Sequence, residues 1–84
     1  MLQELVKIGD VSHYYSNIEV AVVELIDNLK IGDKIMIKGA TTEFTQLVKS
    51  IQIEHNQVNE ADAGDSIGLQ VRFRVRLGDQ VFKL

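Results

Sequence analysis

Alternation of apolar and polar positions is the clearest pattern in this chain of 84 residues. It is strongest near the C-terminus, where every second residue over one stretch is apolar. These positions are Ile67, Leu69, Val71, Phe73 and Val75. A period of two is typical of a strand with one buried face. We therefore predict a strand over residues 67–75 with these five side chains in the core.

Other segments predict strands through their β-branched and aromatic content. They cover residues 4–15, 18–26, 34–38, 44–53 and the C-terminal residues 80–84. The apolar positions change parity within two of these segments, so we predict β-bulges near Gly9 and Leu47. Residues 54–62 are polar and tolerate helix, which predicts a long loop with one helical turn.

Gly-Asp pairs punctuate the predicted strands. Four of the six glycines precede Asp, at Gly9, Gly32, Gly64 and Gly78. Glycine accepts a left-handed backbone, and Asp can then bond the local backbone, so the pair favours a turn. Six short strands joined in this way predict an all-β fold. We expect one domain over residues 1–84, a small six-stranded Greek-key β-barrel.

Composition narrows the function classes. The net charge is −3, whereas general nucleic-acid binders are basic overall, although a local basic patch stays open. The chain has no Cys, which excludes disulfides and thiolate metal sites. It has no apolar run near the roughly 20 residues of a membrane span. The first residues lack the features of a signal peptide, so we predict a cytoplasmic location and no membrane partner.

Several segments resemble domain II, the β-barrel of translational GTPases such as elongation factor Tu. The chain is most similar to the small stand-alone proteins called translation elongation factor-like. The matching segments are Ile8–Val11, Leu29–Ile35, Val48–Gln52, Ala63–Leu69 and Gly78–Val81. Their order and spacing run through nearly the whole chain. The resemblance implies the barrel fold and an association with translation, with RNA or ribosomal components as partners.

A second resemblance implies an alternative. Val11–Tyr15 and Glu43–Gln46 are similar to the C-terminal barrel of some collagenase-like peptidases. In those proteins the barrel is an appendage and not the catalytic part. This similarity implies a protein-interaction or adaptor barrel for a larger enzyme.

The first resemblance does not imply GTPase activity. GTP hydrolysis needs the phosphate-binding pattern Gly-x-x-x-x-Gly-Lys-Ser/Thr, which this chain lacks. The elongation-factor barrel also helps to hold the aminoacyl end of tRNA. The matching positions here are Gln52, His55 and Asp65. Asp65 keeps the acid of the turn, but Gln52 and His55 replace an acid and an arginine, so that pocket is altered.

All the arginines of the chain lie at every second position, at Arg72, Arg74 and Arg76. In a strand they would share one face. Guanidinium groups bind phosphate or carboxylate in a bidentate manner, so this face could contact RNA or an acidic protein surface. The alternative is a solvated strand face paired with neighbouring glutamates. The candidate binding residues are therefore Arg72, Arg74, Arg76, Asp65, His55 and Gln52.

No pattern indicates a catalytic or metal site. His13 and His55 would have to converge with a carboxylate such as Asp10 or Glu54 to bind a metal, and their spacing does not indicate this. We therefore predict a non-enzymatic binding module without metal or cofactor. Its partner is RNA or the translation apparatus, or alternatively a protein. The pattern leaves monomer and dimer both open.

Overall fold

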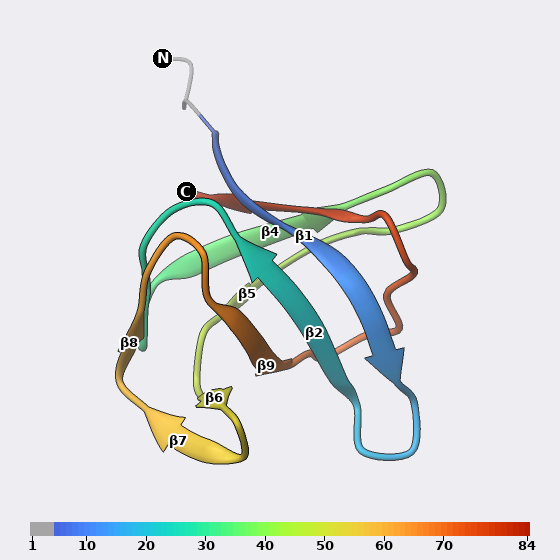
Figure 1. Ribbon diagram of the computed structural model, residues 1–84. Coiled ribbons are helices and arrows are strands. Elements are labelled where there is room, and N and C mark those ends of the chain that lie inside the picture. Colours follow the sequence, from blue (N-terminus) through green and yellow to red (C-terminus); the bar gives the residue numbers. More distant parts are fainter. Residues whose placement is uncertain (1–4) are drawn as a thin grey trace.

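The computed structural model describes residues 5–84, and Figure 1 shows them as antiparallel strands joined by turns. The all-β prediction is confirmed. No helix among the described residues is long and apolar enough to cross a membrane. The strands are β1 (Val6–Tyr15), β2 (Val20–Leu25), β3 (Leu29–Lys30), β4 (Lys34–Lys38), β5 (Glu43–Leu47), β6 (Ile51–Ile53), β7 (Asn56–Val58), β8 (Glu60–Ala61), β9 (Ser66–Gln70) and β10 (Gln80–Lys83).

The strands form an eight-stranded sheet in the order β5-β4-β10-β1-β2-β9-β6-β7 and a two-stranded sheet of β3 and β8. The predicted six-stranded Greek-key barrel is not confirmed. The predicted strand over residues 44–53 is divided, because the chain leaves β5 after Leu47 and re-enters the sheet at β6. Residues 54–62 contain β7 and β8 where one helical turn was expected.

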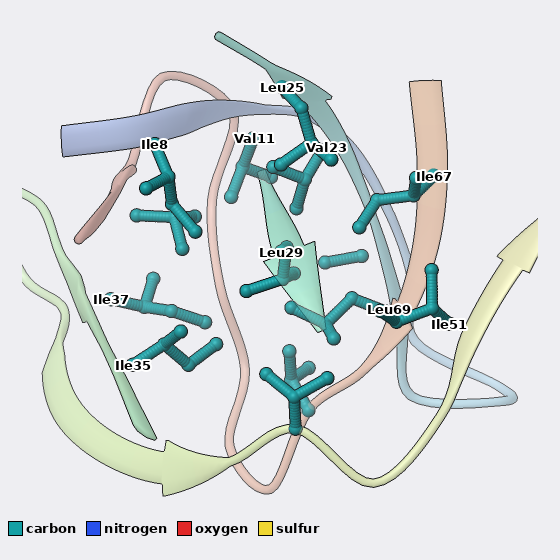
Figure 2. Packing of buried hydrophobic residues seen from close by; sticks show 14 of the residues in the cluster. Ile8, Val11, Val23, Leu25, Leu29, Ile35, Ile37, Ile51, Ile67 and Leu69 are labelled. Atoms are coloured by element: carbon teal, nitrogen blue, oxygen red, sulfur yellow. The ribbon is translucent and has the colours of Figure 1, made fainter. Parts of the chain in front are cut away.

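Buried side chains from strands across the large sheet pack together in one hydrophobic cluster. Figure 2 shows Ile8, Val23, Ile37 and Leu69 approaching from different strands, with Leu29 among them. All five side chains are buried. Burial of an aliphatic side chain contributes about 1.5–3 kcal/mol, so this cluster is the main source of stability. Because these side chains occupy the interior, the side chains on the opposite faces of the strands point to the solvent.

Two register shifts in β1 decide which of its side chains face outward. The first lies between Lys7 and Gly9, which confirms the bulge predicted near Gly9. The second lies between Val11 and His13 and was not predicted. Each shift changes the parity of the strand. Val11 therefore points into the core, whereas His13 is exposed on the outer face.

Three Gly-Asp pairs form the same turn. The φ angles are 94° at Gly32, 94° at Gly64 and 88° at Gly78, which is the left-handed region that a type II turn requires. In each turn the following Asp accepts the backbone N–H three residues earlier, at 2.9 Å. The predicted turn chemistry is confirmed at these pairs, whereas Gly9-Asp10 lies within β1.

The alternating segment does not form one strand. β9 ends at Gln70, and residues 71–79 follow an irregular path to β10, drawn as the orange to red trace in Figure 1. The prediction of a strand to residue 75 is therefore wrong. Val71 and Val75 are buried as expected, but Phe73 is 55% exposed. The backbone of this segment forms hydrogen bonds to groups outside a strand ladder.

Candidate functional site

The six candidate residues fall into three places. Arg72, Arg74 and Arg76 lie in residues 71–77, which we call the arginine segment. Gln52 and His55 line a groove between two hairpins. Asp65 belongs to a Gly-Asp turn. The structure therefore does not bring the six residues into one site.

Hydrogen bonds to other elements hold the backbone of the arginine segment. The N–H of Val71 donates to the carbonyl of Glu19 at 3.0 Å. The N–H of Arg72 donates to Oε1 of Gln46 at 2.9 Å, and Nε2 of Gln46 donates to the carbonyl of Gln70 at 2.9 Å. These partners replace the ladder bonds of a strand. The alternation alone could not reveal them, since Gln46 is distant in the chain.

The arginines do not share one strand face, because the segment is not a strand. All three are exposed. The guanidinium carbon of Arg72 lies 5.6 Å from the centre of the Phe73 ring. Phe73 in turn meets Phe44 edge-on, with ring centres 5.1 Å apart and planes at 72°. The exposed Phe73 thus stands between an arginine and a half-buried aromatic ring.

Two depressions flank the arginine segment. One of about 310 Å³ lies between the end of β5 and residues 70–72, and its lining includes Leu47 and Arg72. The other, of about 380 Å³, lies beside β5 and includes Phe44, Phe73 and Arg74. Cationic and apolar groups therefore alternate along this side of the molecule.

The second candidate site is a groove of about 230 Å³ between the β1–β2 hairpin and the β6–β7 hairpin, which we call the hairpin groove. The turns of both hairpins point to the same end of the molecule in Figure 1. The residues that line the groove are Tyr15, Ile18, Val20, Val22, Gln52, Glu54, His55, Ser66, Ile67 and Gly68. Val20, Val22 and Gly68 belong to the paired strands β2 and β9, so they form its floor.

Asp65 is occupied within its own turn. Its Oδ2 accepts the N–H of Asp62 at 2.9 Å, and its carbonyl accepts the N–H of Leu25 at 2.9 Å. The side chain is half-buried. The structure thus gives Asp65 a role in turn geometry, away from Gln52 and His55 in the hairpin groove.

Sequence reasoning did not select several groove residues. Ile18 lies in the predicted strand over residues 18–26 but is exposed in the turn before β2. Tyr14 is half-buried and packs on the core, whereas the neighbouring Tyr15 is 47% exposed. Gly68 was passed over, although it is one of the glycines that Asp does not follow. The absence of a following Asp was the sequence feature that could have set Gly68 apart from the turn glycines.

The two histidines have separate surroundings. The ring of His13 lies 4.3 Å from that of Tyr15, centre to centre, on the outer face of β1. His55 is in the β6–β7 turn. Among residues 5–84, no three His, Cys, Asp or Glu side chains converge in a way that could hold a metal ion.

The hydroxyls of Ser12 and Ser66 both donate to Oε2 of Glu24, at 3.0 and 2.7 Å.

Curated proteins similar to this chain are proteases. An uncharacterised protease of Methanocaldococcus jannaschii is 42% identical over 80 residues, which are 94% of this chain and 20% of that protein. A collagenase of Porphyromonas gingivalis is 32% identical over 83 residues, which are 96% of this chain and 20% of the collagenase. The chain therefore spans about a fifth of the length of the curated relatives it matches. No protein-family model matches it.

Solved structures share the fold. The C-terminal domain of a “putative U32 peptidase” from Geobacillus thermoleovorans gives a TM-score of 0.87 at 20% identity, covering 100% of this chain and 99% of that one. Its selenomethionine variant gives 0.85 at 21% identity, covering 94% and 98%. At this level of identity the likeness establishes the fold alone.

These findings correct the first resemblance. The similar proteins are proteases and a peptidase C-terminal domain, so the prediction of a translation elongation factor-like, RNA-binding module is wrong. The segments that suggested it are largely Gly-Asp turns, such as those at Gly32 and Gly78. Such turns specify backbone geometry, and one geometry serves many functions. The relatives support the second resemblance, to the C-terminal barrel of collagenase-like peptidases.

Proposed function

We propose that this chain is a non-catalytic accessory domain that binds the catalytic part of a collagenase-like peptidase. The observation that carries the proposal is the 42% identity to a protease over 94% of this chain but only 20% of that protein. A segment matched in this way behaves as a module appended to a larger body. The peptide-bond chemistry then belongs to the remainder of the peptidase, whether it shares the chain or binds as a separate subunit.

The arginine segment is the proposed docking surface. Phe73 is 55% exposed and lies between two exposed arginines, and Leu77 is 71% exposed and follows the third. Aromatic residues and arginine are enriched at protein interfaces and among the residues that dominate binding energy. Arginine also suits bidentate contact with carboxylates. We therefore expect a partner surface that is apolar at its centre and acidic at its edge.

The anchoring of this segment also favours docking. Gln46 bonds the backbone on both sides of Val71, at Gln70 and Arg72. A segment that is already ordered loses less conformational entropy when it binds. The same side chain joins β5 to the segment after β9, so we propose that it closes a barrel among the described residues 5–84. We also propose that residues 1–84 are one domain. The cytoplasmic location stays a prediction.

A chimera tests the function. The collagenase of Porphyromonas gingivalis is compared in three forms: intact, with its matching segment deleted, and with that segment replaced by this chain. Collagen digestion is the readout, as the name of that protein indicates. We expect the deletion to lower digestion and this chain to restore it. A chimera no more active than the deletion, with the inserted domain folded by circular dichroism, contradicts the proposal.

Matched variants locate the surface. This chain is added as a separate protein to the deleted collagenase, and association is measured by calorimetry. Phe73→Ser with Arg74→Glu should weaken association by about tenfold or more. The control pair, Ile26→Ser with Lys30→Glu, changes an apolar residue that is 58% exposed and an exposed cation elsewhere. Equal losses in both pairs would exclude the arginine segment as the docking surface.

A further inference from the structure

The hairpin groove has properties that docking through the arginine segment does not use. Within residues 5–84, the residues that line the groove differ from those that line either depression beside the arginine segment. Its floor is apolar, from Val20 and Val22, and Ile18 and Tyr15 extend the apolar surface at one wall. Gln52 and His55 add groups at the other wall that donate and accept hydrogen bonds. An apolar floor with a few polar groups is the usual character of a binding pocket.

Gly68 keeps the groove open. It lies inside β9, where glycine weakens a strand, and its φ is not in the left-handed region. The backbone therefore does not require glycine here. A Cβ at this position would lie 3.4 Å from Cγ1 of Val20 and 3.8 Å from Cβ of Gln52, which are ordinary contacts. A side chain would fit, but it would fill the floor. Glycine in a strand interior often marks a bulge, a tight bend or a site where a ligand or another backbone approaches closely, and the pairing of Gly68 with Val22 is regular, without a bulge.

The turn of the β6–β7 hairpin retains side chains at a cost in backbone energy. Glu54 and His55 have φ angles of 50° and 67°, the pattern of a two-residue type I′ turn. Such turns favour Asn-Gly, because most side chains disfavour positive φ. This turn instead carries two long side chains, and both line the groove. Residues in disfavoured conformations cluster at binding sites, so this strain points to a use for the two side chains.

The charge of the groove selects its ligand. Glu54 is among the lining residues, and Ser66, another of them, holds the carboxylate of Glu24 at 2.7 Å. Among the residues that the structure describes, no lysine or arginine lines the groove. Its volume of about 230 Å³ is below the range typical of drug-sized ligands, so it suits one side chain of a longer segment. A cation beside that side chain would complement the glutamates.

We propose that the hairpin groove binds an extended polypeptide segment with one bulky apolar side chain flanked by lysine or arginine. The apolar side chain lies over Val20, Val22 and Gly68, and the cation lies beside Glu54. This site is separate from the docking surface, and its test needs no peptidase. The failure of one proposal therefore leaves the other standing.

Nuclear magnetic resonance titrations of the ¹⁵N-labelled chain at low salt test the proposal. The probes are blocked peptides of sequence Gly-Lys-Leu-Lys-Gly, Gly-Glu-Leu-Glu-Gly and Gly-Lys-Ser-Lys-Gly. We expect the first to shift the amides of Val22, Gly68 and His55, and the other two to have little effect. Equal shifts with the acidic or the serine peptide, or shifts confined to residues 71–77, would overturn the proposal.

Variants distinguish groove binding from general attraction. Gly68→Val should abolish the shifts while the amides of distant core residues keep their positions. Glu54→Gln should weaken binding about two- to fivefold, as for an exposed ion pair. The control is Glu43→Gln, an exposed residue of β5 outside the groove, which should bind as the unmodified chain does. Unchanged binding by Gly68→Val contradicts the proposal, and so do groove shifts on concentrating the chain alone, which would identify a second copy as the occupant.

Discussion

Some residues at the hairpin groove have backbone conformations that are unfavourable for residues other than glycine. Glu54 and His55 hold positive φ, and Glu19, with φ of 56°, does the same in the turn of the other hairpin that borders the groove. A positive φ at a residue other than glycine lowers the stability of the fold by about 1–3 kcal/mol. The glycines at positive φ, by contrast, lie in the Gly-Asp turns, where they relieve strain. Stability and surface chemistry thus compete at the hairpin groove.

Replacing Glu54 and His55 by Asn and Gly tests this competition. The double variant Glu54→Asn, His55→Gly gives the turn the residues that its backbone favours. We expect the free energy of unfolding to rise by about 1 kcal/mol or more, because strain is removed. Urea denaturation measures the change. Binding of the Lys-Leu-Lys peptide should fall in the same variant. A loss of stability would mean that the packing of these side chains outweighs the strain of the turn.

At the scale of elements, the side chain of Gln46 provides hydrogen bonds on the side of β5 that has no neighbouring strand among the described residues. β5 pairs with β4 on one side, and on its other side Gln46 bonds Gln70 and Arg72. Gln46 is 7% exposed and its bonds to Gln70 and Arg72 are part-buried, so water replaces these bonds only in part if the side chain is removed. This one amide therefore positions the arginine segment relative to the sheet.

Gln46→Ala should accordingly destabilise the fold and loosen the arginine segment. A fully buried backbone group that loses its partner costs about 1–3 kcal/mol, and we expect the low end of this range because these groups are part-buried. Hydrogen exchange should become faster at the Arg72 amide before it does in β1 or β2. The matched control is Gln80→Ala, an exposed glutamine in β10, which should change stability little. Unchanged exchange at Arg72 would show that other contacts hold the segment.

At the scale of the molecule, one small core supports two separate surfaces. A chain of 84 residues buries about 60–65% of the surface that its unfolded form exposes, so its core is modest. Leu29 lies among side chains of the large sheet and is completely buried, although β3 belongs to the small sheet. The two sheets are thus joined through the core. Damage at this point should affect the hairpin groove and the arginine segment together.

Leu29→Ala tests the shared core. A buried Leu→Ala change costs about 2–5 kcal/mol, against a total stability of about 5–15 kcal/mol for a typical protein. Urea denaturation should therefore show a large fall in the transition midpoint. Leu77→Ala is the same substitution at a residue 71% exposed and should be nearly neutral. A small effect at Leu29 would mean that the core closes around the missing side chain.

Local chemistry made much of the fold predictable. The Gly-Asp turns were predictable because the φ angle of Gly32 and the bond from Asp33 to the N–H of Lys30 both act within four residues. The all-β class followed from alternation and residue type for the same reason. The candidate residues stay a prediction: Gln52 and His55 line the hairpin groove, and the three arginines lie in the arginine segment.

The sequence by itself determined the all-β class and the three Gly-Asp turns, because neighbouring residues create them. Only the tertiary structure decided where residues 71–77 lie, since the N–H of Arg72 bonds a side chain 26 residues away. It likewise assembled the hairpin groove from Ile18, His55 and Gly68, which no local pattern connects. Alternation of apolar and polar residues predicts which side chains are buried. It does not predict which distant residue will form hydrogen bonds with the backbone. That choice moved Phe73 from the expected core to the surface.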